Sequence, residues 1–131
     1  MITFSNVSKT YNGKHALNSV NFQLEQGEMA FLTGHSGAGK STFMKLIHHL
    51  DTPTRGMVEV NGRKVNRLKR FQVPKHRRNI GIIYQNPYLL DGQTVYENVA
   101  MPLIIARYRD EEIAKRVRAA LNKVGLLDKE K

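Results

Sequence analysis

The chain has 131 residues, of which 40% are hydrophobic and 24% charged, and its 21 Lys and Arg outnumber its 11 Asp and Glu to give a net charge of +10. This composition is typical of a folded domain or part of one, and the lack of cysteine excludes a disulfide framework and a thiolate metal site. The longest strongly apolar run, residues 99–106, is too short to cross a bilayer, and residues 1–5 lack the features of a secretory signal, so we expect a cytoplasmic protein.

The first part of the chain is predicted to be rich in strands. Residues 2–7 and 20–24 alternate apolar and polar side chains, as half-buried strands do, and a turn containing Asn12-Gly13 lies between them. Residues 29–33 and 80–84 are short apolar runs that indicate buried strands. Residues 57–60, followed by Asn61-Gly62, indicate a hairpin.

Helical patterns occupy one segment of the first part and most of the last third. Residues 40–50 carry apolar side chains at helical spacing. Thr94 is a candidate N-cap, and Glu97 three residues later completes a capping box. A further helix begins with acidic residues 110–112 and ends at Gly125. Its predicted buried face consists of Ile113, Val117, Leu121 and Val124.

A glycine-rich segment lies between the predicted strand at 29–33 and the predicted helix at 40–50. It fits the pattern G-x-x-x-x-G-K-[ST], with a strand before it and a helix after it, the context in which this pattern binds phosphate. Its residues are Gly34, His35, Ser36, Gly37, Ala38, Gly39, Lys40, Ser41 and Thr42. An ordinary glycine-rich turn that caps a helix is the less favoured interpretation.

The spacing of this segment suits a nucleoside triphosphate. Its glycines allow backbone conformations in which successive N–H groups point into the loop. The positive end of the dipole of the following helix adds to the attraction for phosphate. Lys40 supplies a charge for the β- and γ-phosphates, and Ser41 supplies a hydroxyl for Mg²⁺. The sequence therefore predicts a site for ATP and Mg²⁺.

Two further residues accompany the phosphate loop: Tyr11, near the turn between the first two predicted strands, and Gln85, directly after the predicted strand at 80–84. With this order of elements, essentially the whole chain resembles the N-terminal part of an ATP-binding-cassette (ABC) nucleotide-binding domain. The resemblance implies an α/β fold of the P-loop NTPase class. Residues 1–87 would form the antiparallel β subdomain and the P-loop core, and residues 88–131 the start of the helical subdomain.

The resemblance also implies roles for individual residues. Tyr11 would stack on the adenine, and residues 34–42 would bind the phosphates of ATP. Gln85 would reach Mg²⁺ and the attacking water, so that Lys40 and Gln85 are the catalytic candidates and Ser41 and Gln85 the Mg²⁺ ligands. The LSGGQ-like motif, the Asp-Glu strand end and the switch histidine of the family do not occur in the 131 residues. We therefore expect the first part of a cassette domain, an ATPase by family that by itself binds ATP with little or no turnover.

Within the family, residues 27–42, 94–106 and 124–129 resemble the cell-division ATP-binding proteins. This implies an integral membrane subunit, a second copy of the cassette and other cell-division proteins as partners, with the protein at the cytoplasmic face of the inner membrane. Residues 50–56 fit the ATPases of lipoprotein-release and macrolide exporters equally well, which keeps that function open as an alternative. A basic phosphate-loop protein that acts on nucleic acid is the alternative of another class.

The run between residues 63 and 78 is strongly basic. Its cations are Arg63, Lys64, Arg67, Lys69, Arg70, Lys75, Arg77 and Arg78. A solvated face is the favoured interpretation, while a nucleic-acid patch and contact with anionic lipid head groups stay open. Phe71 is the single aromatic residue in the run, which disfavours nucleic acid.

Overall fold

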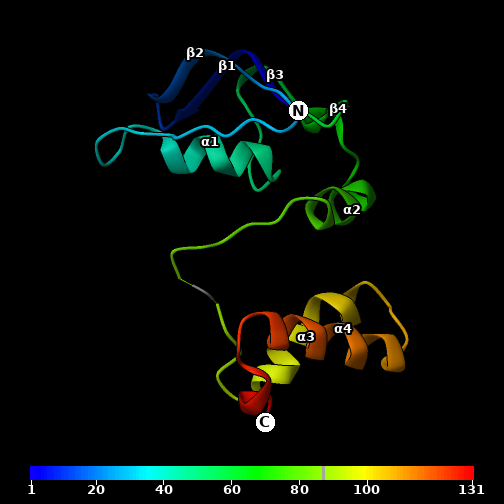
Figure 1. The fold of residues 1–131 in the computed structure, drawn as a ribbon. Helices are drawn as coiled ribbons and strands as arrows, with labels where there is room; N and C mark the ends of the chain where they lie inside the picture. Colours follow the sequence, from blue (N-terminus) through cyan, green and yellow to red (C-terminus); the bar gives the residue numbers. More distant parts are fainter. Residues whose placement is uncertain (87) are drawn as a thin grey trace. The chain divides into compact units, whose positions relative to one another are not determined.

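The computed structural model describes residues 1–86 and 88–131 (Figure 1). The chain divides into two compact units, Met1–Ile82 and Ile83–Lys131. Each unit has its own hydrophobic cluster. The predicted boundary at residue 87 lies outside the described residues.

The first unit contains a four-stranded antiparallel sheet in the order β2-β1-β3-β4. The two long strands, β1 (Ile2–Tyr11) and β2 (Lys14–Leu24), join through the predicted turn at Asn12-Gly13. The shorter β3 (Arg55–Val60) and β4 (Arg63–Lys64) form the predicted hairpin. Both expectations from the alternating patterns are confirmed, and β1 and β2 are longer than predicted.

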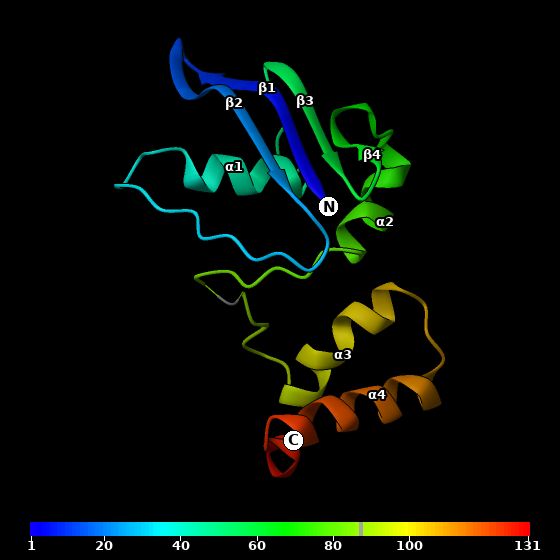
Figure 2. The same cartoon turned by 45° about the horizontal axis from the view of Figure 1, so that its top comes forward.

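Helix α1 (Lys40–Ile47) lies across one face of this sheet (Figure 2). The Phe43 ring stacks on the Phe4 ring with centroids 4.1 Å apart and planes 7° apart, and Phe22 meets both rings edge-on. Leu46 and Ile47 fill the same core from the helix. Burial of the apolar face thus fixes α1 to the sheet.

Helix α1 ends earlier than its apolar spacing predicts. His49 adopts a left-handed conformation, with φ of 52°, and its N–H bonds to the Leu46 carbonyl. The Leu50 N–H reaches the Lys45 carbonyl, which completes a Schellman end. A histidine thus occupies the position that glycine usually holds, and Leu50 lies outside the helix.

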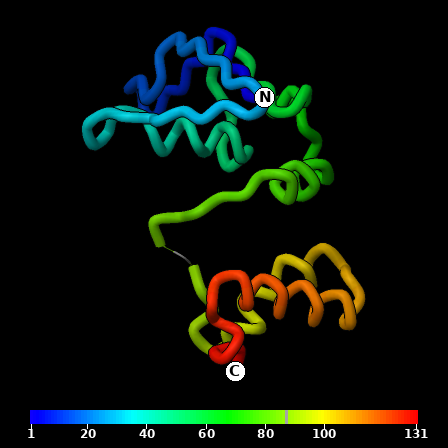
Figure 3. The backbone as a smooth tube through the Cα atoms, in the orientation of Figure 1, coloured from blue at the N-terminus to red at the C-terminus, as the bar shows by residue number. Residues whose placement is uncertain are grey.

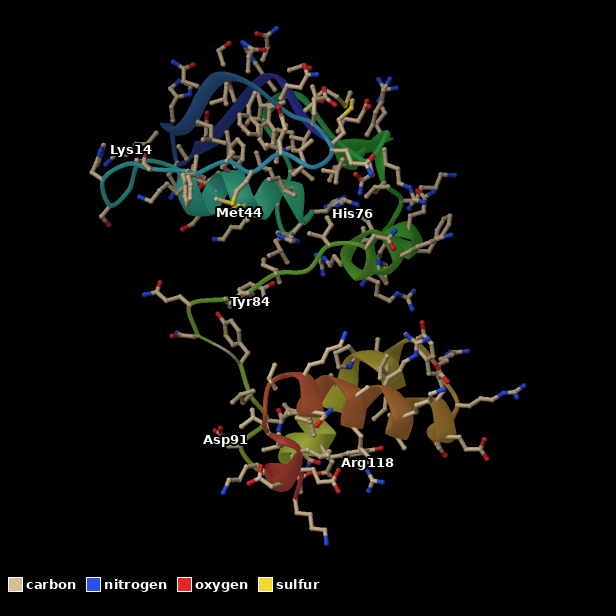
Figure 4. The ribbon with its side chains drawn as sticks, in the orientation of Figure 1. Lys14, Met44, His76, Tyr84, Asp91 and Arg118 are labelled. Carbon is tan, nitrogen blue, oxygen red and sulfur yellow. The ribbon has the colours of Figure 1, made fainter. Side chains whose placement is uncertain are left out.

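Between β4 and the end of the first unit lie three short helices. Two are 3₁₀ turns, Val65–Arg67 and Arg70–Gln72, and the third is α2 (Val73–Arg78). His76 of α2 is buried, with its Nε2 2.8 Å from the Ile47 carbonyl oxygen at the end of α1 (Figure 4). This contact holds α2 against α1.

The strands predicted at 29–33 and 80–84 are not formed, and these predictions are wrong. No described residue pairs with either run in a ladder, and Figure 3 traces the first as an irregular path that leads into α1. Phe31 is 83% exposed and Ile83 is fully exposed. A strand is stable only when neighbours satisfy its N–H and C=O groups, and the apolar pattern of a run does not supply those neighbours.

The second unit is a pair of helices, α3 (Val95–Ile105) and α4 (Asp110–Lys123), followed by a 3₁₀ turn at Leu127–Lys129. The predicted capping box is confirmed: the Thr94 hydroxyl accepts from the Glu97 N–H at 3.2 Å, and the Glu97 carboxylate accepts from the Thr94 N–H at 2.7 Å.

The core of the second unit is small. Its buried residues are Ala100, Ile113, Val117 and Leu121. The prediction for Val124 is wrong, because α4 ends at Lys123 and Val124 is 66% exposed. Along residues 1–86 and 88–131, none of the helices combines the length and the apolar character that crossing a membrane requires.

Candidate functional site

The phosphate loop ends where α1 begins, against strand β2. Gly39 has φ of +90°, and a Cβ at this position would meet the Ala16 carbonyl oxygen and lie 2.9 Å from Leu17 Cδ2. Only glycine permits both this conformation and this approach. The last glycine of the predicted motif therefore fixes the loop to the sheet.

The first turn of α1 presents backbone donors toward the loop. The N–H of Phe43 makes the first bond of the helix, to the Gly39 carbonyl at 2.8 Å. The preceding N–H groups at the N-terminus of a helix have no carbonyl of their own helix to bond, and the helix dipole makes this end positive. Residues 34–38 and Ser41 are exposed, so the loop faces solvent. This arrangement can bind a phosphate group.

The Lys40 ammonium lies over the loop. Its Nζ donates to the Gly34 carbonyl at 2.6 Å and to the His35 carbonyl at 2.8 Å. These two contacts direct the cation across the loop opening rather than away from it. Among the predicted residues, the structure thus brings together the glycines, Lys40 and the exposed Ser41 hydroxyl.

Tyr11 lies at the end of β1, beside the first turn of α1. Its hydroxyl donates to Asp51 Oδ2 at 2.5 Å, and this hydrogen bond is the main cause that raises the pKa of Tyr11. The Thr42 hydroxyl is near enough to act on the Tyr11 phenol in the opposite sense and lower its pKa. The ring is 40% exposed, and Lys9 Nζ lies 4.9 Å from its centroid.

Asp51 is the centre of this polar cluster. Its carboxylate accepts from Lys9 Nζ at 2.5 Å and from the Thr52 N–H at 2.7 Å, in addition to Tyr11. Burial alone raises the pKa of Asp51, but the hydrogen bonds from Lys9, Tyr11 and Thr52 outweigh it and hold that pKa below its ordinary value of 3.8. The cluster fixes the direction of the Tyr11 ring.

The sequence interpretation missed Lys9 and Asp51. A partial signal existed for Lys9, because it lies two residues before Tyr11 on the same strand, where side chains share a face. Asp51 follows the end of α1, and nothing in its local pattern indicates that it faces β1.

Gln85 belongs to the second unit and is exposed. Its neighbour Tyr84 meets Tyr88 edge-on, with ring centroids 5.4 Å apart. The roles of Gln85 as a catalytic residue and Mg²⁺ ligand, and its place in one site with Lys40, stay predictions. The same holds for the role of Tyr11 as an adenine platform.

Comparison with known proteins gives consistent matches. A family model described as "ABC transporter" matches residues 17–131. The chain is similar to the cell division ATP-binding protein FtsE of Escherichia coli (strain K12), with 54% identity over 100% of this chain and 60% of that protein. FtsE of Haemophilus influenzae is 47% identical over 98% of this chain and 60% of its own length. The chain therefore spans 60% of the length of these curated relatives.

Solved structures match as well. A dimeric ATP-binding cassette in a post-hydrolysis state, bound to ADP and Pi, superimposes with a TM-score of 0.81 at 38% identity. The match covers 93% of this chain and 56% of that one. The structure neighbours agree with the predicted fold class, an ABC nucleotide-binding cassette.

The Asp51 cluster generates a prediction about stability and pH. The variant Asp51→Asn should lower the free energy of unfolding at about pH 7 by about 1–2 kcal/mol, because the charge-assisted hydrogen bonds from Lys9 and Tyr11 are lost. The folded-state pKa of Asp51 is depressed, so its contribution exists above pH 3.8 and disappears as the pH falls through the folded value. Urea denaturation followed by circular dichroism should show the full difference at about pH 7 and a smaller one at about pH 2.5. Asp91→Asn, an exposed position, is the control; an equal loss at both pH values would contradict the assignment.

Proposed function

The chain belongs to the ABC transporter family, and we propose that it is the ATP-binding part of an FtsE-like subunit. In this proposal the subunit binds ATP with Mg²⁺ and couples ATP binding and hydrolysis to an FtsX-like integral membrane subunit in cell division. The observation that carries the proposal is the phosphate loop at the N-terminus of α1, with Lys40 directed across it.

The loop residues supply the contacts for the phosphates. Backbone N–H groups of the loop and of the first turn of α1 would bind the phosphates, and Lys40 would exchange its bonds to the Gly34 and His35 carbonyls for bonds to phosphate oxygens. The exchange is favourable because a bond between two charged groups is stronger than one between an ammonium and a carbonyl.

The residues present fit a metal bound together with ATP. The Ser41 hydroxyl is exposed at the first turn of α1, next to Lys40. Mg²⁺ takes most of its ligands from phosphates and water, so one protein hydroxyl is enough to bind it together with ATP. Bound Mg²⁺ would neutralise phosphate charge, and Gln85 stays the further ligand that the sequence resemblance implies.

Tyr11 supplies the platform for the base. Its ring is partly exposed, and the bond to Asp51 holds it beside the first turn of α1. A fixed aromatic face loses little entropy when a base stacks on it.

The partner surface is assigned to Gln85 and residues 88–106 of the second unit. This segment exposes large apolar side chains that its own small core leaves uncovered, among them Tyr88 (75% exposed), Leu89 (62%) and Ile105 (64%). Such side chains are typical of an interface. The subunit would act peripherally at the cytoplasmic face of the inner membrane, as a dimer of cassettes. An exporter ATPase would share the ATP site and differ in the membrane subunit that it binds.

ATP binding should depend on Lys40. We expect Lys40→Ala to lower the affinity for ATP by about 100-fold or more, below detection by calorimetry, because the charge over the loop is lost. Lys45→Ala, an exposed lysine in the last turn of the same helix, is the matched control and should bind normally. Unchanged ATP affinity in Lys40→Ala would remove the central claim.

Tyr11 should act on the base and not on the phosphates. Tyr11→Ala should weaken ATP by about 5- to 10-fold while tripolyphosphate binds nearly as before, because only the stacking surface is removed. Tyr11→Phe retains the ring without the bond to Asp51 and should bind ATP more tightly than Tyr11→Ala. If both ligands lose affinity equally, Tyr11 is not the base platform.

The partner surface should be separable from ATP binding. Leu89→Glu and Ile105→Glu, both at exposed positions, should abolish pull-down of an FtsX-like protein because a charge is placed in an apolar contact. ATP affinity, measured in the same preparations, should not change. Lys115→Glu on α4 is the control. Retained pull-down in both variants would count against this surface.

A further inference from the structure

The segment from β4 to α2 forms a basic surface, defined here as the exposed Lys and Arg of residues 63–78. All eight are exposed: Arg63, Lys64, Arg67, Lys69, Arg70, Lys75, Arg77 and Arg78. Seven of them lie on short elements of the first unit, β4, the two 3₁₀ turns and α2, and Lys69 lies between the two 3₁₀ turns (Figure 1). The basic run of the sequence is therefore a stretch of exposed cations, of which Arg77 also bonds to the end of α1.

No acidic residue compensates this charge locally. From Val60 to Leu90 the sequence contains neither Asp nor Glu. In residues 1–86 and 88–131, no carboxylate lies within ion-pair distance of any of the eight cations. An ordinary solvated face intersperses both signs of charge, and this one does not.

The basic surface is held in place by hydrogen bonds to the end of α1, of which the one from His76 is buried. His76 bonds to the Ile47 carbonyl, and Arg77 donates to the carbonyls of His48 at 3.1 Å and His49 at 2.8 Å. These bonds fix α2 to the end of α1. The cations on either side of His76 and Arg77, Lys75 and Arg78, are exposed on this fixed helix.

The basic surface also carries an exposed aromatic ring. Phe71 is 76% exposed and directly follows Arg70. A single phenylalanine among cations suits the boundary between lipid head groups and acyl chains, where the ring enters the apolar layer and the cations stay at the phosphates. Binding of single-stranded nucleic acid uses several aromatic rings for successive bases, and the run has one.

Residues close to Phe71 in the sequence line an open hollow of about 470 Å³. Its lining is His49, Leu68, Arg70, Val73, Pro74 and Arg77. The lining combines two arginines with the apolar side chains of Leu68, Val73 and Pro74, a combination that suits a phosphate group attached to a glycerol backbone. The hollow thus offers cationic side chains for the phosphate of a phospholipid and apolar side chains for the glycerol attached to it.

We propose that the basic surface binds anionic phospholipid head groups, with Phe71 inserted at the interface and one head group in the hollow beside Arg70 and Arg77. This contact is independent of ATP and of a membrane protein partner. It attaches the first unit to an anionic bilayer directly, through electrostatic attraction that each exposed cation strengthens.

The test is co-sedimentation of the 131-residue chain with vesicles. Vesicles of phosphatidylcholine with roughly 30% phosphatidylglycerol should bind the chain, and vesicles of phosphatidylcholine alone should not. Raising the salt from about 0.1 M to about 0.5 M should weaken the binding strongly, because the surface charges are screened. Equal binding to the two vesicle types would overturn the proposal.

Two double variants distinguish the effect of this surface on vesicle binding from the effect of the net charge alone. Lys69→Glu/Arg70→Glu should weaken binding to anionic vesicles by about 25-fold or more, at about 5-fold per cation removed. Lys115→Glu/Lys131→Glu changes the formal charge by the same amount on the second unit and should have a much smaller effect. Equal losses in the two variants would overturn the assignment to residues 63–78.

Phe71→Ser distinguishes a lipid surface from nucleic acid. It should weaken vesicle binding by about 5- to 10-fold without changing the net charge, because the inserted apolar ring is lost. A short DNA duplex at the same salt should bind more weakly than the anionic vesicles. Tighter binding to the duplex, lost in Lys69→Glu/Arg70→Glu, would assign the surface to nucleic acid and overturn the proposal.

Discussion

The stacked pair of Phe4 and Phe43 joins the phosphate loop to the sheet. Phe43 is the fourth residue of α1, so the ring that anchors the helix lies directly beneath the turn that presents the loop. Gly39 adds a second constraint at the same place, because its bare Cα lies against Ala16 and Leu17 of β2. The loop therefore lies on a packed core at one end, and its exposed donors keep their direction.

Local signals in the sequence predicted features of both units. The turn at Asn12-Gly13 and the capping box at Thr94 each depend on neighbours within a few residues, and each is formed. The motif at residues 34–42 is equally local, and it lies directly before α1 as predicted. The failures depend on distant partners. Residues 29–33 and 80–84 have the composition of strands but no described strand beside them. Val124 has the correct helical spacing, but Lys123 is already the last residue of α4.

The polar cluster at Asp51 also depends on partners that are distant in the sequence, so local patterns could not predict it. Lys9 and Asp51 are 42 positions apart in the sequence, and only the packing of β1 beside the end of α1 brings them to 2.5 Å. For the cations of residues 63–78 the lack of acidic partners is visible in the sequence itself, because residues 60–90 contain no Asp or Glu. The described structure adds none, since no ion pair in it involves these cations. Charge that is paired fixes a side chain, and charge that is left unpaired on an exposed segment is available for a partner.

The geometry ties Tyr11 and the phosphate loop to the same helix of the first unit. Tyr11 is tied to Asp51, and Asp51 lies just beyond the end of α1, while Thr42 in the first turn of that helix acts on the same phenol. Tyr11 and the loop at residues 34–42 are thus both fixed to α1. In the proposed function, a nucleotide that spans them would therefore need little ordering of the first unit on binding. Gln85 lies in the second unit, which has its own core, so its predicted role depends on residues outside the unit that carries the loop.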